Sequence, residues 1–133
     1  MQQERVASGT VPYRFGTDKK CQVLVVKSTN GKSWVFPKGG VEAHLSRREN
    51  ALKESYEEAG VIGCPGKKVG RYSYLKGGVM QDVHMYEMLV VEELEVYPES
   101  EKRERRWVDL DEVPDLLGPD HQFLLVSLME RFS

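Results

Sequence analysis

The stretch from Phe36 to Val61, FPKGGVEAHLSRRENALKESYEEAGV, constrains this chain most, because it combines a glycine turn with one short helix. Ser46 and Glu49 have the spacing of a capping box, in which hydroxyl and carboxylate satisfy the open backbone amides of a first helical turn. Gly60 can take the left-handed conformation that ends a helix. The sequence therefore predicts a helix that starts at Ser46, ends at Gly60 and has about 14 residues.

Helical spacing of about 100° per residue gives this helix an apolar face and an acidic face. The apolar face carries Leu52, Tyr56 and Ala59, and the acidic face carries Glu54, Glu57 and Glu58. The acids lie near the helix C-terminus, where the dipole costs roughly 0.3–1 kcal/mol per charge. A solvated acidic face is the ordinary interpretation of such a trio. The unfavourable position and the adjacent glycine turn instead favour oxygen ligands for a hard divalent cation, Mg²⁺ or Mn²⁺.

This stretch resembles the Nudix box, whose pattern is Gly, five residues, Glu, seven residues, Arg-Glu, apolar, any, Glu-Glu, any, Gly, apolar. The match runs from Gly39 through Glu54 to the segment 57–61, with the spacing intact. Leu45 replaces the first Glu of the pattern, Lys53 replaces its Arg, and Ser55 replaces an apolar residue. In the family that Glu and Arg are understood to brace the loop against the helix. We expect a substituted brace, with Leu45 packed inward and Lys53 paired with Glu49.

The remaining chain is typical of strands and helices that alternate within one compact domain spanning residues 1–133. We expect strands at 4–15, 21–26, 34–36, 67–75, 80–96 and 105–108, with further helices at 109–117 and 119–132. This order predicts an α/β fold with a mixed sheet covered on both faces. The resemblance implies the same architecture, the Nudix-type α/β/α sandwich.

Composition excludes several classes of protein. A net charge of −2 argues against a general nucleic-acid binder, which would be basic. No apolar run approaches the ~18 residues of a membrane span, and we expect no membrane partner. Cys21 and Cys64 lack metal or redox spacing, which favours reduced thiols and a cytoplasmic protein. The oligomeric state is left open.

The resemblance implies a hydrolase of phosphoanhydride bonds that binds its metal through Glu54, Glu57 and Glu58. Glu54 and Glu58 are the expected direct ligands, because residues four apart on a helix point to one place. The carbonyl of Gly39 is a further candidate ligand. These glutamates form the expected catalytic set, and the sequence does not identify the general base.

A small-molecule polyphosphate substrate needs cations and close backbone approach. The candidate substrate-binding residues are Arg14, Lys38, Gly39, Gly40, Arg103 and Arg105. An exposed Arg or Lys is more often solvated than a ligand, so Lys38, which Pro37 and the glycines fix beside the expected metal, is the strongest candidate.

Weaker candidates lie elsewhere in the chain. Arg71 and His84 could contact substrate, although a single His in a strand more often serves packing. Trp107, Tyr72 and Tyr74 are expected in the core rather than in a base-stacking platform.

Three functions compete at this point. Resemblance to diphosphoinositol polyphosphate and diadenosine polyphosphate hydrolases favours one of those two substrates. The runner-up is a nucleotide-pool or nucleotide-sugar pyrophosphatase. A non-catalytic Nudix-like binding domain is the third, motivated by the changes at Leu45 and Lys53 but opposed by the three retained glutamates.

Overall fold

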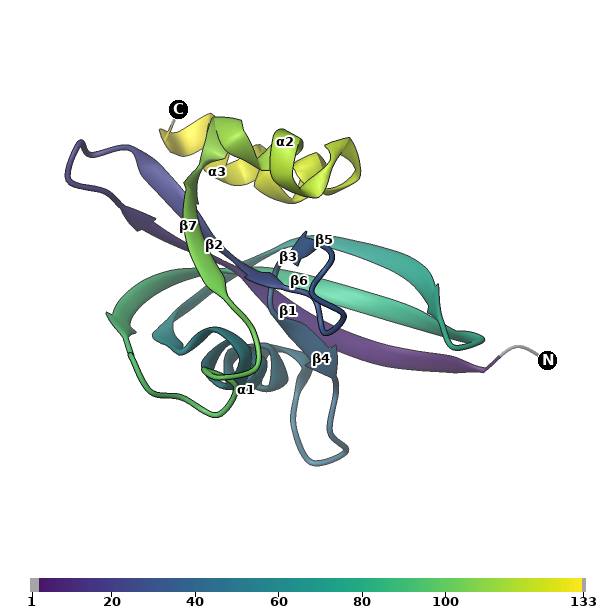
Figure 1. The fold of residues 1–133 in the computed structure, drawn as a ribbon. Coiled ribbons are helices and arrows are strands. Elements are labelled where there is room, and N and C mark those ends of the chain that lie inside the picture. The colour runs from purple at the N-terminus through teal and green to yellow at the C-terminus, as the bar shows by residue number, and fades with distance from the viewer. Residues whose placement is uncertain (1–2, 133) are drawn as a thin grey trace.

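The computed structural model describes residues 3–132 and builds them around one mixed sheet (Figure 1). The strands are β1 (Glu4–Phe15), β2 (Cys21–Lys27), β3 (Trp34–Val35), β4 (Lys38–Gly40), β5 (Val61–Lys76), β6 (Val79–Glu93) and β7 (Arg105–Asp109). The main path runs β3-β2-β1-β6-β5, with β4 also paired to β1 and β7 to β2. β1 and β6 run parallel, while the other pairs are antiparallel.

Helices cover both faces of this sheet (Figure 1). Helix α1 (Arg47–Ala59) lies on one face, and α2 (Val113–Leu117) and α3 (Val126–Phe132) lie on the other. Two 3₁₀ helices, η1 (Leu110–Glu112) and η2 (Pro119–Leu125), precede α2 and α3. The predicted α/β/α sandwich is therefore confirmed.

The ends of α1 are where local chemistry places them. Ser46 caps the helix through the amide of Glu49, and the Glu49 carboxylate accepts from the Ser46 amide, so the capping box is complete. Gly60 ends the helix with φ of 66°.

The prediction for the apolar face of α1 is partly wrong. Tyr56 is 40% exposed, whereas Ala51, Ser55 and Ala59 are buried against the sheet. The Ser55 hydroxyl donates to the Ala51 carbonyl (2.8 Å) and shares a 2.6 Å hydrogen bond with Thr10 of β1. The helix thus approaches the sheet through small side chains, which leaves the larger ring outside and explains a serine at an apolar position of the box.

Other boundaries also differ from the prediction. β5 begins at Val61, not at residue 67, because its first half pairs with the end of β6 across a register shift. The glycine turn is itself a short strand, β4, in which Gly39 pairs with Ser8. The final segment begins as the 3₁₀ helix η2, and only its last turns are α-helical.

Candidate active site

Strand β4 delivers Gly39 directly onto the acidic face of α1. A Cβ built on Gly39 would lie 2.4 Å from the Glu54 carboxyl carbon, so no larger residue fits without displacing that side chain. Buried Asn50 fixes β4 to the helix and to β1. Its amide nitrogen donates to the Gly39 carbonyl (3.2 Å) and to the Ser8 hydroxyl (3.1 Å), and its oxygen accepts from the Glu42 amide (3.3 Å). Sequence reasoning missed Asn50, although a poor helix former inside a helix was a signal.

Glu58 and Glu54 form the buried part of the acid cluster. Glu58 is only 6% exposed, accepts from the Lys38 amide (3.4 Å) and pairs with Arg103 (3.5 Å). Burial raises the pKa of Glu58 to about 8; Arg103 opposes this rise, and the charge of Glu54 adds to it. Burial likewise raises the pKa of Glu54. The two carboxyls hydrogen-bond to each other, and the charge of each affects the pKa of its neighbour.

Glu57 is tied to Lys53, which also lies 4.0 Å from the Glu54 carboxylate. Lys53 contacts the carboxylates of both Glu57 and Glu42, the latter at 3.0 Å. The predicted pairing of Lys53 with Glu49 is wrong, because the Glu49 carboxylate is occupied by the helix cap. Leu45 is half-buried and packs in neither core cluster of the described residues. The brace is therefore rebuilt with Glu42 from the loop.

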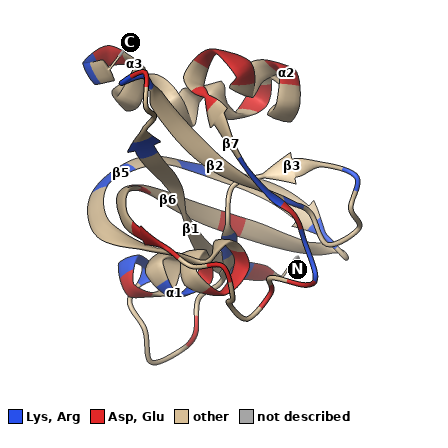
Figure 2. Ribbon diagram, turned by 60° about the vertical axis from the view of Figure 1, so that its left-hand side comes forward, with Lys and Arg blue, Asp and Glu red and all other residues tan. Residues whose placement is uncertain are grey.

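Glu99 is a fourth carboxylate that sequence reasoning missed. It lies in the segment between β6 and β7, which runs beside the acidic residues of α1 (Figure 2). Its carboxylate pairs with Arg103 (2.8 Å), its amide donates to the Glu57 carbonyl (3.0 Å), and its charge raises the pKa of Glu54 and Glu58. A polar loop has no periodicity, so nothing in the sequence distinguished this acid from its neighbours.

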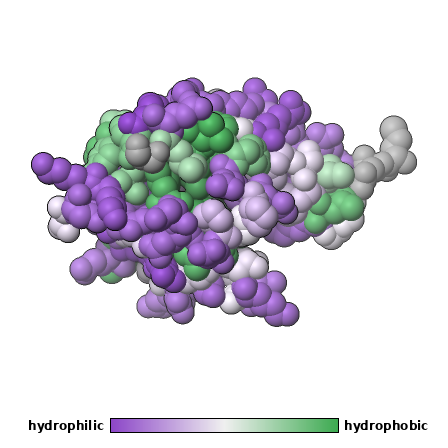
Figure 3. Space-filling model, turned by 90° about the horizontal axis from the view of Figure 1, so that it is seen from above, coloured by the Kyte–Doolittle hydropathy of each residue, from purple (hydrophilic) through white to green (hydrophobic). Residues whose placement is uncertain are grey.

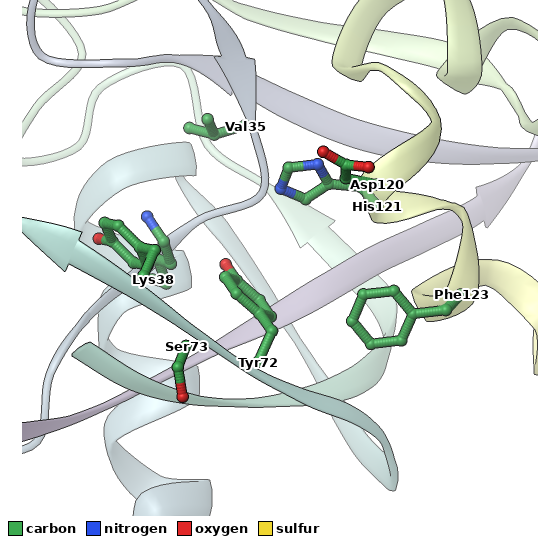
Figure 4. A pocket seen from close by; sticks show the side chains of 8 residues that line it. Val35, Lys38, Tyr72, Ser73, Asp120, His121 and Phe123 are labelled. Carbon is green, nitrogen blue, oxygen red and sulfur yellow. The ribbon is translucent and has the colours of Figure 1, made fainter. Parts of the chain in front are cut away.

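Two cavities open beside the acid cluster. The polar cavity, of 370 Å³, is lined by Ser28, Thr29, Asn30, Ser33, Val35, Lys38, Glu58, Tyr74, Lys76 and Arg103. The aromatic cavity, of 430 Å³, is lined by Val35, Lys38, Tyr72, Ser73, Tyr74, Asp120, His121 and Phe123 (Figure 4). Val35, Lys38 and Tyr74 belong to both, so the two form one continuous cleft. The Lys38 ammonium lies 5.2 Å from the centre of the Tyr74 ring, at the junction.

The tyrosines do more than the core role predicted for them. Tyr72 and Tyr74 contact the core cluster that also contains Val83 and Met85, yet both remain half-buried and face the aromatic cavity. Their ring centres are 6.2 Å apart, and Phe123 meets Tyr72 edge to face.

Residues 4–128 match the family model of the NUDIX domain. The chain belongs to the Nudix family. It is 41% identical over 121 residues to Nudix hydrolase 4 of Arabidopsis thaliana, covering 84% of this chain and 58% of that protein. It is 30% identical over 122 residues to diphosphoinositol polyphosphate phosphohydrolase 2 of Rattus norvegicus, covering 90% of this chain and 66% of that protein. The chain thus spans less than two thirds of the length of Nudix hydrolase 4.

A solved structure confirms the fold of this Nudix chain. An Ap4A hydrolase of C. elegans, in a binary complex, superimposes with a TM-score of 0.81 at 19% identity, covering 96% of each chain. Nudix hydrolase 18, mitochondrial, of Arabidopsis thaliana is 40% identical over 119 residues, with 84% of this chain and 68% of that protein covered. Because that relative is named as mitochondrial, the cytoplasmic location of this chain stays a prediction. Among residues 3–132, no helix is long and apolar enough to span a membrane.

Nudix hydrolases generally use divalent metal ions, and the acid cluster fits one. Among the described residues, no group of three or more His, Cys, Asp or Glu side chains is already arranged to hold a metal ion. The fit comes from the donors themselves. Glu54 and Glu58 are neighbouring carboxyls whose pKa values are raised by burial, the charge of Glu99 acts on both, and the backbone of Gly39 lies against the Glu54 carboxyl. Glu57 would have to leave Lys53 to join them.

Two of the predicted substrate-binding arginines lie away from the two cavities. Arg14 donates to Gln22 and Glu93 and lies over the Trp107 ring, at 4.1 Å from its centre. Arg105 donates to the Ala59 carbonyl (2.8 Å) and pairs with Glu93. Arg14 therefore joins strands β2, β6 and β7, and Arg105 ties β7 to the end of α1. By contrast, Lys38 and Arg103 line the polar cavity.

The weaker candidates form a separate cluster. Arg71 pairs with Asp82 (2.8 Å), and His84, which is 1% exposed, contacts Asp82 (3.1 Å) and Lys68 (2.6 Å). These side chains satisfy one another and line neither cavity of the cleft.

Proposed function

We propose that this Nudix chain hydrolyses phosphoanhydride bonds in dinucleoside polyphosphates, with Mg²⁺ or Mn²⁺ bound at Glu54, Glu58, Glu99 and the Gly39 carbonyl. The observation that carries the proposal is the continuous cleft. Its polar cavity places cations beside the acid cluster, and its aromatic cavity adds a site for a flat ring. A nucleoside polyphosphate has both parts, whereas a bare polyphosphate leaves the aromatic cavity unused.

Each side chain then has a role in the reaction. Lys38, Lys76 and Arg103 neutralise the phosphates and orient the chain for attack by water. A divalent cation held by Glu54, Glu58 and Glu99 would polarise the phosphoryl oxygens and lower the pKa of an attacking water. Glu54 and Glu58 would have to be ionised to hold it. Arg103 also keeps Glu58 and Glu99 in position through its two ion pairs.

Diphosphoinositol polyphosphate is the second candidate substrate. The identity to the Rattus norvegicus protein of that specificity supports it. A third cavity of 380 Å³ shares Ser28, Thr29 and Arg103 with the polar cavity and extends it, although its two added lysines, Lys27 and Lys102, are matched by Glu101 and Glu104. An inositol ring is saturated and densely charged, so it gains little from an aromatic cavity.

A substrate panel separates these candidates. We would measure kcat/KM with Mg²⁺ for diadenosine tetraphosphate, a diphosphoinositol polyphosphate, a nucleotide sugar and a nucleoside triphosphate. The proposal expects the dinucleoside to be the best substrate by at least about tenfold, since one lost polar contact in a cavity already costs that much. Preference for the inositol compound overturns the choice of substrate. Preference for a nucleotide sugar or triphosphate favours the pyrophosphatase alternative, and no turnover at all favours the binding domain.

Two variants connect that activity to the cleft. Lys38→Gln should lower kcat/KM for every substrate, because it removes the cation at the junction of the cavities. Lys19→Gln, in the exposed turn after β1, is the matched control and should change nothing. Equal activity of the two variants contradicts the assignment of the cleft.

A further inference from the structure

The cleft continues past the acid cluster into the third cavity, so that its two ends differ in chemistry. The polar cavity shares Lys38 with the aromatic cavity and Arg103 with the third cavity. Among the described residues, none lines both the aromatic cavity and the third cavity. The polar cavity, which contains Glu58, therefore lies between the two ends.

Two loops enclose the third cavity. Thr29 comes from the turn between β2 and β3, and Glu101 and Glu104 come from the segment between β6 and β7. Hydrogen bonds hold the loops together, since the Lys27 amide donates to the Glu104 carbonyl (3.0 Å) and Arg103 donates to the Lys27 carbonyl (3.3 Å). The cavity is thus built by both segments.

The third cavity has neither the free charge of the polar cavity nor the rings of the aromatic cavity. Its two lysines are balanced by Glu101 and Glu104, and Arg103 is already paired at the acid cluster. No aromatic side chain of the described residues lines it. A further phosphate would meet two carboxylates there, and a nucleobase would find no ring on which to stack.

The third cavity does offer unused hydrogen-bonding groups. The hydroxyls of Thr29 and Ser100 and the carboxylate of Glu101 have no hydrogen bond or ion pair to any other described residue. A carboxylate accepts hydrogen bonds from the hydroxyls of a ribose, and a hydroxyl can both donate and accept. These groups suit a neutral ligand that carries neighbouring hydroxyls.

We propose that the third cavity binds the sugar at the far end of the substrate through its hydroxyls, and that the base attached to this sugar is not recognised. The inference rests on the proposed function, because it assumes that the polyphosphate lies along the cleft with one base in the aromatic cavity. The length of the phosphate chain, rather than a second base, then separates a dinucleoside polyphosphate from a nucleotide sugar, because the cations of the polar cavity lie between the two ends.

Three analogues of one chain length test this proposal. Each has adenosine at one end of a tetraphosphate whose bridging oxygens are replaced by methylene groups, which prevents hydrolysis, and the other end carries adenosine, ribose or methyl. We would measure their binding to the full chain by calorimetry with Mg²⁺. The ribose compound should bind within about threefold of the adenosine compound, because the second base gains no stacking. It should bind about tenfold more tightly than the methyl compound, which lacks the hydroxyls.

A double variant locates the effect in the third cavity. Thr29→Val combined with Glu101→Ala should bring the affinities for the ribose and methyl compounds close together. The matched control, Thr17→Val combined with Glu95→Ala, changes the same residue types at exposed positions outside the three cavities and should keep the preference. Because the two compounds carry the same charge, the loss of a carboxylate does not by itself change their ratio.

Equal binding of the ribose and methyl compounds by the wild type overturns the inference, since the hydroxyls are then not recognised. A loss of affinity beyond the stated margin on removal of the second adenine also overturns it, as does an unchanged preference in the double variant. In each case, turnover of ordinary diadenosine tetraphosphate, measured in parallel, would still support the proposed function. The expected preferences without that turnover support the inference and overturn the proposed function, and no binding of any analogue overturns both.

Discussion

Replacing Glu58 with Gln should stabilise the metal-free protein at pH 8, although it removes a carboxylate from the proposed metal site. Glu58 is buried with Glu54 nearby and has Arg103 as its cation. An amide of the same shape keeps the space filled and carries no charge. Arg103 stays paired with Glu99 (2.8 Å), so the substitution leaves it with an anionic partner.

The sign and size of this change in the free energy of unfolding follow from the raised pKa of Glu58. An acid whose pKa rises from 4.5 to about 8 on folding gives its full stability below pH 4.5 and loses it as the pH climbs to 8. At pH 8 the loss is of order 4 kcal/mol, at 1.36 kcal/mol for each pKa unit. The raised pKa of Glu54 acts in the same direction.

Urea denaturation at pH 5 and pH 8, in a chelator, measures this effect. The free energy of unfolding of the wild type should fall between the two pH values by several kcal/mol more than that of Glu58→Gln. Glu130→Gln, at an exposed position on α3, is the matched control and should follow the wild type. Mg²⁺ should then restore the stability of the wild type at pH 8, because a bound cation removes the repulsion between the carboxylates. It should raise the stability of Glu58→Gln much less.

Parallel pH profiles for wild type and Glu58→Gln would refute the reasoning, since they would mean that Glu58 titrates near its ordinary value. A normal pH effect with an equal response of both proteins to Mg²⁺ would keep the buried acid but remove Glu58 from the metal site.

Three further substitutions test how the site is held. Asn50→Ala should cost about 2–4 kcal/mol by denaturation, because three hydrogen bonds end on that buried amide; a cost below about 1 kcal/mol would contradict its bridging role. Lys53→Met and Glu42→Gln should each weaken the response of thermal stability to Mg²⁺, and the double variant should be no worse than either alone. Additive effects would exclude the rebuilt brace. Arg131→Ala should cost about 2–3 kcal/mol, because it leaves the buried Glu87 without its ion pair, and Glu87→Gln in the same chain should recover part of it.

Local chemistry made the centre of the site predictable. The cap at Ser46 and the stop at Gly60 depend on residues a few positions apart, and the structure has both. Alternation likewise located β1, whose bounds agree with the prediction. In each case the interaction that fixes the element lies within the element or its immediate neighbours, so the sequence contains all of it.

Contacts between distant segments were not predictable in this way. Several acids lie close to Lys53 in the sequence, and the path of the loop brings Glu42 into contact with it. Glu99 approaches α1 only because the segment after β6 turns back across the end of that helix. Likewise, His121 enters the cavity because η2 packs over the sheet. These contacts depend on the path of the chain in three dimensions. Packing between distant segments sets that path, and local sequence patterns do not reveal it.

The candidate basic residues differ in the partners that they have within the protein. Among the described residues, Arg14 and Arg105 have carboxylate partners and planar contacts, as suits a rigid guanidinium that joins strands. By contrast, no ion pair in that part of the chain involves Lys38 or Lys76, although both line the cavity that contains Glu58. Neither lysine is committed to an anion of the protein, so both are available to a bound ligand. Together with Arg103, they mark where a polyphosphate would bind. Figure 3 shows the face on which α2 and α3 lie, where apolar side chains are exposed among hydrophilic ones.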